Sequence, residues 1–393
     1  MSSETTPSAQ AYQKLSAEQS EIRLLLLFPA SAFDEQIQCG IFKASLRRLE
    51  NPAPFNALSY VWGDPSGTVP IYLNGHQHQV TRNLESALRH LRHLKYKVLW
   101  VDALCINQKD LHERESQIRY MKQIYTISKQ TLAWMGASSD DPTSKCNKTK
   151  ILLWNPTHEQ QFKEHFKNTS ALENVTIIRP KLASEAHLVF DFLQRVADSG
   201  YHRHSLFLDD GSAPYSQTSG LVASSGSSRL VDALQRFANN PWWYRIWTLQ
   251  ESVLPDNILM LWGIHSIKFS DVDKASGTFA HHFQRRCCQW PSGAENLEEH
   301  CTRLQNNVSP ISYLRGMVRA GEVRLALVLL DNGNRESTDP RDQVYGVLGL
   351  TTFRWPWERY EDQLQHASSP DLSDGDNPLN SRYRQSSYTC YSA

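Results

Sequence analysis

The chain has 393 residues, in which 41 lysines and arginines balance 41 aspartates and glutamates. This length is sufficient for a large hydrophobic core, and the even charge argues against a global attraction to nucleic acid, anionic membranes or acidic substrates. Seven cysteines without a repeated spacing argue against a secreted disulfide framework.

The first segment, residues 1–20, is polar and rich in Ser, Thr, Gln and Glu, so we expect a disordered tail. It lacks the basic and apolar regions of a signal peptide, and the longest apolar run, Leu24 to Phe28, is too short to span a bilayer. We therefore expect a cytoplasmic protein with reduced thiols, without nucleic-acid or membrane partners.

From Ile22 onward, short apolar runs bounded by Pro and Gly predict strands. The Asn74-Gly75 pair between PIYL and HQHQV is a strong β-hairpin signal. After Thr81 the spacing of Leu84, Leu88 and Leu91 predicts a helix that ends near residue 95.

The next elements alternate between buried strands and helices. VLWVDALCI, over residues 98–106, predicts a strand covered on both faces, and TLAWMG predicts another after a helix over about residues 111–128. This alternation predicts an α/β fold with a mostly parallel sheet flanked by helices.

The second half of the chain has a weaker pattern. We expect residues 137–228 to be a variable insertion and linker that contains one amphipathic helix, SEAHLVFDFLQRVADSG. The apolar pattern of residues 229–332 predicts helices and one further strand, and the Ser-rich residues 351–393 are expected to form a loop-rich tail. The main domain is thus expected over residues 21–350, with a helical C-terminal part.

A first group of candidate site residues lies in Tyr60-Val61-Trp62-Gly63-Asp64-Pro65, where an apolar strand ends in a turn. Ligands of parallel sheets bind outside the carboxyl ends of strands, so Trp62 could stack on a ring and Asp64 could bind a hydroxyl. The alternative is a strand end whose aromatic residues pack on a neighbouring helix.

A second group, Asp102, Cys105, Asn107 and Gln108, follows the buried VLWV strand. A carboxylate at this edge is a common ribose or metal contact, but Asp102 could equally brace the following loop through backbone N–H groups. Cys105 is expected to be an inert core thiol, because no histidine stands at a spacing that identifies a partner.

A third group is Trp247-Thr248-Leu249-Gln250-Glu251, where helical spacing places Trp247 and Glu251 on one face. A glutamate beside a tryptophan in a cleft would have its charged form disfavoured and could act as a general acid or base. Glu251 could instead pair with Arg245 or another cation.

Metal-ligand atoms are also present, in His281, His282, Cys287, Cys288, His300 and Cys301. Their adjacent pairs are unlike the separated Cys-x-x-Cys knuckles of structural zinc sites, so we predict no metal site.

Six blocks in order resemble the fungal heterokaryon incompatibility (HET) domain: ALSYVWGDP, NLESALRHLR, LWVDALCINQKDLHERESQIRYMKQIY, AWMG, WWYRIWTLQES and DPRDQVYGVLGL. They cover about residues 56–136 and 240–350. The tail RYRQSSYTCYS resembles the start of the family's next segment, although Arg382 stands where an acidic residue is expected. The chain stops there, which is compatible with a truncated or minimal member.

The resemblance implies a role in non-self recognition, in which contact between different hyphae triggers programmed cell death. One hypothesis is a non-enzymatic module that self-associates and recruits protein partners in incompatibility signalling. The other hypothesis is an NAD-cleaving enzyme that assembly activates, with NAD as its substrate rather than a resident cofactor.

HET domains have been proposed to be distant relatives of Toll/interleukin-1 receptor (TIR) domains, which implies a TIR-like or flavodoxin-like core. LSYVWGD looks like the first TIR strand and loop, and Trp247 with Glu251 is similar to the Trp-Cys-x-x-Glu element of NAD-cleaving TIR domains. Thr248 stands in place of that cysteine. The resemblance makes Glu251 the catalytic candidate, and the predicted ligand-binding residues are Tyr60, Trp62, Asp64, Asp102, Asn107 and Trp247.

Overall fold

A computed structural model of the chain describes residues 12–142, 184–199, 226–285 and 295–351. Within these residues nine strands form one sheet, in the order β5-β4-β2-β1-β6-β3-β7-β8-β9. The strands are β1 (Glu21–Leu27), β2 (Gln38–Ser45), β3 (Ala53–Tyr60), β4 (Thr68–Leu73), β5 (His76–Thr81), β6 (Val98–Trp100), β7 (Ser128–Trp134), β8 (Ile258–Trp262) and β9 (His265–Lys268).

Ten α-helices and one short 3-10 helix accompany the sheet in the described part of the chain. They are α1 (Arg82–His93), α2 (Asp102–Cys105), α3 (Leu111–Ile127), α5 (Glu185–Ser199), α6 (Gly226–Ala238), η6 (Pro241–Trp243), α7 (Trp247–Val253), α8 (Phe269–Arg285), α9 (Glu295–Ala320), α10 (Leu325–Asn332) and α11 (Asp342–Leu348). None of these helices combines the length and apolar character needed to cross a bilayer.

The α/β class predicted from the sequence is confirmed, but the prediction of a mostly parallel sheet is wrong. The four central strands β6, β3, β7 and β8 pair in parallel, and β2 also pairs in parallel with β4. The other four pairings are antiparallel. Helical connections allow the parallel centre, whereas the tight connections β4–β5 and β8–β9 require antiparallel neighbours.

The Asn74-Gly75 hairpin is confirmed between β4 and β5. Both residues have positive φ, 51° at Asn74 and 78° at Gly75, as the favoured two-residue hairpin turn requires. By contrast, the strand predicted over residues 98–106 ends at Trp100. The chain then turns into α2, so Asp102 begins a helical turn directly at the sheet edge.

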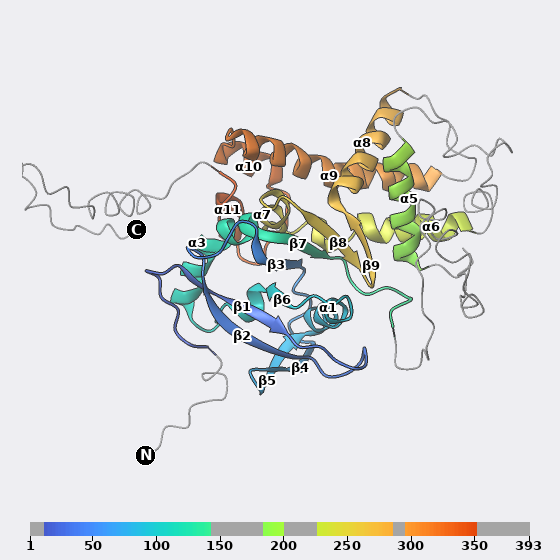
Figure 1. Cartoon of the computed structure of the whole chain (residues 1–393). Helices are drawn as coiled ribbons and strands as arrows, with labels where there is room; N and C mark the ends of the chain where they lie inside the picture. The colour runs from blue at the N-terminus through green and yellow to red at the C-terminus, as the bar shows by residue number, and fades with distance from the viewer. Residues whose placement is uncertain (1–11, 143–183, 200–225, 286–294, 352–393) are drawn as a thin grey trace, which may run out of the picture. The chain divides into compact units, whose positions relative to one another are not determined.

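Two hydrophobic cores lie on the two faces of the sheet. Ala133 of β7 and Met260 of β8 contribute to the core formed with α5 to α9. Their neighbours Leu132 and Leu261 contribute to the other core, formed with α1 and α3, because successive strand residues point to opposite faces. Figure 1 shows α8, α9 and α10 on one side of the sheet and α1 on the other.

The amphipathic helix predicted near residues 184–200 is present as α5, and it packs against α6, α8 and β9. Residues 137–142 and 226–228 of the predicted insertion are also described, the latter as the start of α6, whereas residues 143–183 and 200–225 lie outside the described residues, as do the tail segments 1–11 and 352–393. The described part of the predicted N-terminal tail contacts the domain, since the Tyr12 hydroxyl donates a 3.2 Å hydrogen bond to the Leu104 carbonyl.

The loop after β7 is held by two histidines. His265 Nε2 lies 2.7 Å from Asp140 Oδ2, and His90 Nε2 lies 2.9 Å from Asp141 Oδ2. Gly263 has φ of 58°, and a Cβ atom there would collide with the Asp141 carboxylate and the Ser138 side chain. Glycine at this position therefore lets the loop approach the turn between β8 and β9.

Candidate functional site

Polar side chains gather where the carboxyl ends of β3 and β6 approach α7. Ser59 and Tyr60 are the last two residues of β3, and Asp102 follows β6 by two positions. Glu251 lies on α7, which contacts β3 and α3. The sheet topology thus brings three of the sequence blocks together at one edge of the sheet. We call the side chains that meet there the polar cluster: Ser59, Tyr60, Trp62, Asp102, Tyr125, Trp242, Arg245 and Glu251.

Glu251 is at the centre of the polar cluster and is only 6% exposed. The Ser59 hydroxyl donates a short hydrogen bond to Glu251 Oε2, and Trp242 Nε1 in turn donates to Ser59 Oγ at 2.8 Å. Asn240 positions Trp242, because its side chain accepts from the Trp242 backbone N–H at the start of η6. A chain of donors therefore runs from η6 through β3 to the Glu251 carboxylate.

The pKa of Glu251 is raised from 4.5 to about 7, chiefly by burial. The Ser59 hydrogen bond opposes this rise in pKa, the nearby Asp102 charge adds to it, and Arg245 opposes it. Burial also raises the pKa of Tyr125 well above its ordinary value, and the adjacent Glu251 charge adds to that rise. Near neutral pH, the Glu251 carboxyl can therefore hold or release a proton.

Asp102 forms the outer part of the polar cluster. Its Oδ2 accepts a 2.8 Å hydrogen bond from Trp62 Nε1, and its Oδ1 accepts a 2.7 Å hydrogen bond from the backbone N–H of Ala103. The Tyr60 side chain also hydrogen-bonds this carboxylate. Burial raises the pKa of Asp102, and these hydrogen bonds and Arg245 oppose the rise. Trp62 is 40% exposed, so this part of the cluster reaches solvent.

Arg245 supplies the positive charge of the polar cluster and is itself fixed by the backbone. Its Nη1 donates to the Tyr60 carbonyl at 3.0 Å. The segment that carries Arg245 is held from the C-terminal side, where Arg335 Nη1 donates to the carbonyls of Trp243 at 2.8 Å and Arg245 at 3.3 Å. The segment between α10 and α11 therefore helps to position the cluster.

The structure brings together four of the predicted site residues, namely Glu251, Asp102, Tyr60 and Trp62. The other three, Asp64, Asn107 and Trp247, are not members of the polar cluster. Asp64 is exposed and accepts hydrogen bonds from Ser66 in its own turn, which lower its pKa. Asn107 Oδ1 accepts from the Lys109 backbone N–H at 3.2 Å. Trp247 is half-buried and packs against both hydrophobic cores.

Three members of the polar cluster, Ser59, Tyr125 and Trp242, were not predicted from the sequence. The usable signal for Ser59 was a polar residue within the otherwise apolar ALSYVW strand, because a buried hydroxyl requires a partner. Nothing local marks Tyr125, which α3 brings against β3. Cys105, expected to be inert, is buried, and burial raises its pKa to about 12.

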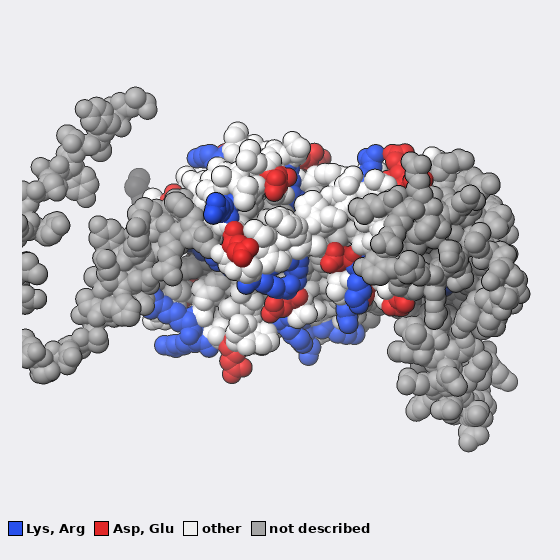
Figure 2. All heavy atoms as spheres, turned by 90° about the horizontal axis from the view of Figure 1, so that it is seen from above, with Lys and Arg blue, Asp and Glu red and all other residues white. Residues whose placement is uncertain are grey.

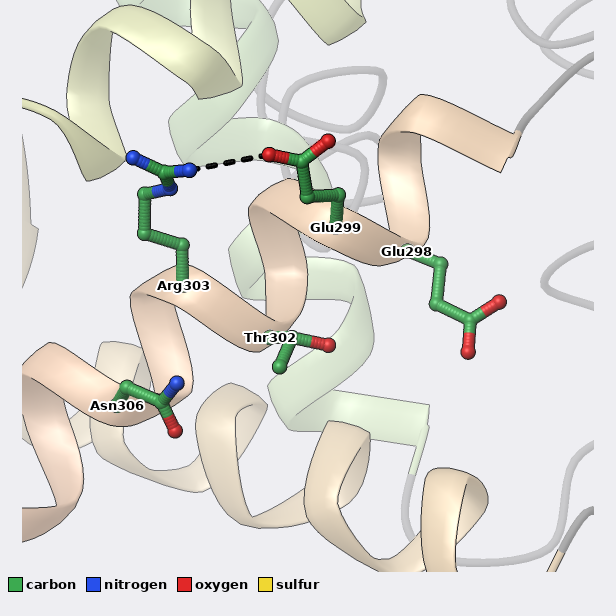
Figure 3. A pocket seen from close by; sticks show the side chains of 5 residues that line it. All are labelled: Glu298, Glu299, Thr302, Arg303 and Asn306. Atoms are coloured by element: carbon green, nitrogen blue, oxygen red, sulfur yellow. Dashed lines mark hydrogen bonds and ion pairs between the residues drawn. The ribbon is translucent and has the colours of Figure 1, made fainter.

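A separate depression runs along α9 and is lined by Glu298, Glu299, Thr302, Arg303 and Asn306 (Figure 3). All five belong to one helix, and Arg303 pairs with Glu299 across it. No member of the polar cluster lines this depression. The described residues contain no group of three histidine, cysteine or acidic side chains that could hold a metal, and Cys287 and Cys288 lie outside them.

Comparison with known proteins identifies the family of the chain. The sequence model of the family described as Heterokaryon incompatibility protein (HET) matches residues 55–251, about half of the chain. The chain belongs to the HET family. The matched HET region begins in β3 and ends at Glu251, so it contains every residue of the polar cluster.

A curated HET relative is similar over most of the chain. Heterokaryon incompatibility protein 6, OR allele, from Neurospora crassa is 26% identical, in an alignment that covers 86% of this chain and 48% of the relative. The chain thus spans about half the length of that HET protein. No solved structure matches the chain.

Proposed function

We propose that this HET-family chain acts in heterokaryon incompatibility, as an effector of non-self recognition and programmed cell death that works through protein contacts and self-association. The observation that carries the proposal is the family match over residues 55–251. The name of the Neurospora relative, a heterokaryon incompatibility protein, supports the same process.

The state of Glu251 favours a protein-contact module over an enzyme. Its carboxylate is nearly inaccessible and is hydrogen-bonded by Ser59, which itself accepts from Trp242. A catalytic carboxylate must approach the reacting atoms of its substrate, whereas a buried one braces the elements that it joins. In the proposed module, Glu251 holds α7 against β3 and thereby stabilises the conformation in which the chain contacts its protein partners.

Expression of the chain from an inducible promoter in a filamentous fungus is expected to arrest growth. The variant Glu251→Gln should retain this arrest, because glutamine still offers an oxygen to the Ser59 hydroxyl and the proposed activity needs no ionisable group. Colony extension and vital staining measure the effect. A well-expressed, folded Glu251→Gln variant that grows normally would contradict a purely structural role for Glu251.

A second candidate is an NAD glycohydrolase of TIR-like type that is activated by assembly. One specific observation favours it: Glu251 and Asp102, two carboxyl groups with raised pKa, interact through their charges, and Asp102 accepts a hydrogen bond from the partly exposed Trp62 indole. In this reaction water replaces nicotinamide on the ribose, and a carboxylate stabilises the positive charge that develops on the sugar. Trp62 would stack on a ring, and Asp102 would bind ribose hydroxyls.

This second candidate predicts that concentrated, purified protein releases nicotinamide and ADP-ribose from NAD. Glu251→Gln should abolish the release, because the amide cannot stabilise the sugar cation, while Asp64→Asn should retain it, because Asp64 lies outside the polar cluster. Chromatography of the products decides the point. A folded wild-type sample that leaves NAD intact at every concentration would remove this candidate and leave the protein-contact module.

A further inference from the structure

Helix α10 carries large apolar side chains on its outward side. Leu327 is 48% exposed and Leu330 is 80% exposed, whereas Val328 and Asn332 are buried against the domain. A short helix with the sequence LALVLLDN is apolar nearly all round, and helices of this kind are normally covered on every side. The outward side of α10 is therefore an apolar surface of the type that forms protein interfaces.

Two opposite charges flank this apolar surface. Arg324 is the N-cap residue of α10, and Asp331 lies one helical turn beyond Leu327, so the two charges stand near opposite ends of the apolar surface. Both side chains are exposed, and neither forms an ion pair with another residue that the structure describes. Figure 2 looks onto the side of the molecule where α9 and α10 lie and shows mainly uncharged surface with isolated charges of both signs.

We propose that the outward side of α10 is the self-association surface of this chain, on which two copies pair with their α10 helices antiparallel about a two-fold axis. This inference rests on the proposed function, which requires self-association, and adds the surface and geometry. The leucines Leu327 and Leu330 of each copy would cover those of the other, which removes them from water.

The charge pattern selects the antiparallel arrangement. A two-fold axis perpendicular to the helices places Arg324 of one copy beside Asp331 of the other, and the same contact is repeated by symmetry. A parallel pairing would instead place Arg324 beside Arg324 and Asp331 beside Asp331. Like charges at such short range destabilise an interface and opposite charges specify its register.

The test measures the mass of the full chain by light scattering or sedimentation over a range of concentrations. Leu330→Glu is expected to raise the dimer Kd about 100-fold, because each dimer loses two buried leucines and gains two carboxylates in their place. Phe42→Glu is the matched control, since Phe42 is also an exposed large apolar residue but lies on β2. It should leave the Kd unchanged.

Charge exchange tests the antiparallel geometry. Arg324→Asp and Asp331→Arg should each raise the Kd about 10-fold, because each creates two like-charge contacts per dimer at a solvent-accessible position. An equimolar mixture of these two variants should associate as tightly as the wild type, since every contact in the mixed dimer then joins opposite charges. Circular dichroism of each variant verifies the fold.

Three results would overturn the inference: a monomeric wild-type chain at every concentration, a Phe42→Glu variant that dissociates while Leu330→Glu does not, or a mixture that fails to restore association. The growth assay is read separately. If the variants change the Kd as expected but expression of the wild-type chain causes no growth arrest, the proposed function is contradicted and the dimer interface still stands.

Discussion

Replacing Arg23 with methionine is expected to lower the free energy of unfolding by about 3–5 kcal/mol, because it leaves the largely buried Glu113 carboxylate without its charged partner. Arg23 is 2% exposed, and its guanidinium donates to both carboxylate oxygens of Glu113, at 2.6 and 2.9 Å. Its Nη1 also donates to the Cys105 carbonyl at 3.2 Å, and its guanidinium lies 5.0 Å from the Tyr12 ring centroid. The measurement is urea unfolding followed by tryptophan fluorescence.

Two controls separate the loss of a partner from the net value of the pair. The double variant Arg23→Met/Glu113→Leu should recover most of the loss, since apolar residues of similar size often replace a buried ion pair without destabilisation. Arg303→Met breaks the exposed Arg303–Glu299 pair on α9 and should change stability by less than about 1 kcal/mol. A double variant as unstable as Arg23→Met would show that the pair itself, and not the orphaned charge, stabilises the fold.

Glu251→Gln is expected to abolish a pH dependence of stability that the wild type shows between about pH 4.5 and 7. The pKa of Glu251 is about 7 in the folded chain against 4.5 ordinarily, so the folded state binds more protons in this interval. The free energy of unfolding therefore falls as pH rises through this window, by up to about 3 kcal/mol. Urea unfolding at pH 5 and pH 8, compared between wild type and variant, measures the effect.

The variant should accordingly be the more stable protein at pH 8, where the wild type holds a buried charge, and lose that advantage at pH 5. Glu299→Gln is the matched control, because Glu299 is an exposed glutamate on α9, outside the polar cluster. It should follow the wild type at both pH values. A parallel response of wild type and Glu251→Gln would show that Glu251 ionises as readily in the folded chain as in the unfolded one.

Local elements could be predicted because their causes are local. The Asn74-Gly75 turn depends on the φ values that these two residues tolerate, and α1 depends on the spacing of Leu84, Leu88 and Leu91. Strand direction has no such cause. A strand with apolar residues on both faces has the same sequence pattern next to a parallel or an antiparallel neighbour, so the mixed sheet could not be predicted from periodicity.

The candidate site was partly predictable for a related reason. Glu251, Asp102, Tyr60 and Trp62 were identified because polar and aromatic residues at strand ends and beside tryptophan carry a chemical signal. Their partners carry none. Ser59 is 192 residues from Glu251, and only the packing of α7 on β3 brings the hydroxyl to the carboxylate.

From the amino-acid sequence alone we could predict the α/β class, the positions of most helices and the HET family, since these depend on local periodicity and on ordered blocks of residues. The folded structure was needed to establish the direction of the outer strands, the short length of β6 and the burial of Glu251. It also showed that Leu327 and Leu330 of α10 face outward, although LALVLLDN has the composition of a buried helix. Hydrogen-bond partners, burial and exposed faces depend on contacts between distant segments, and a chain acquires these contacts only when it folds.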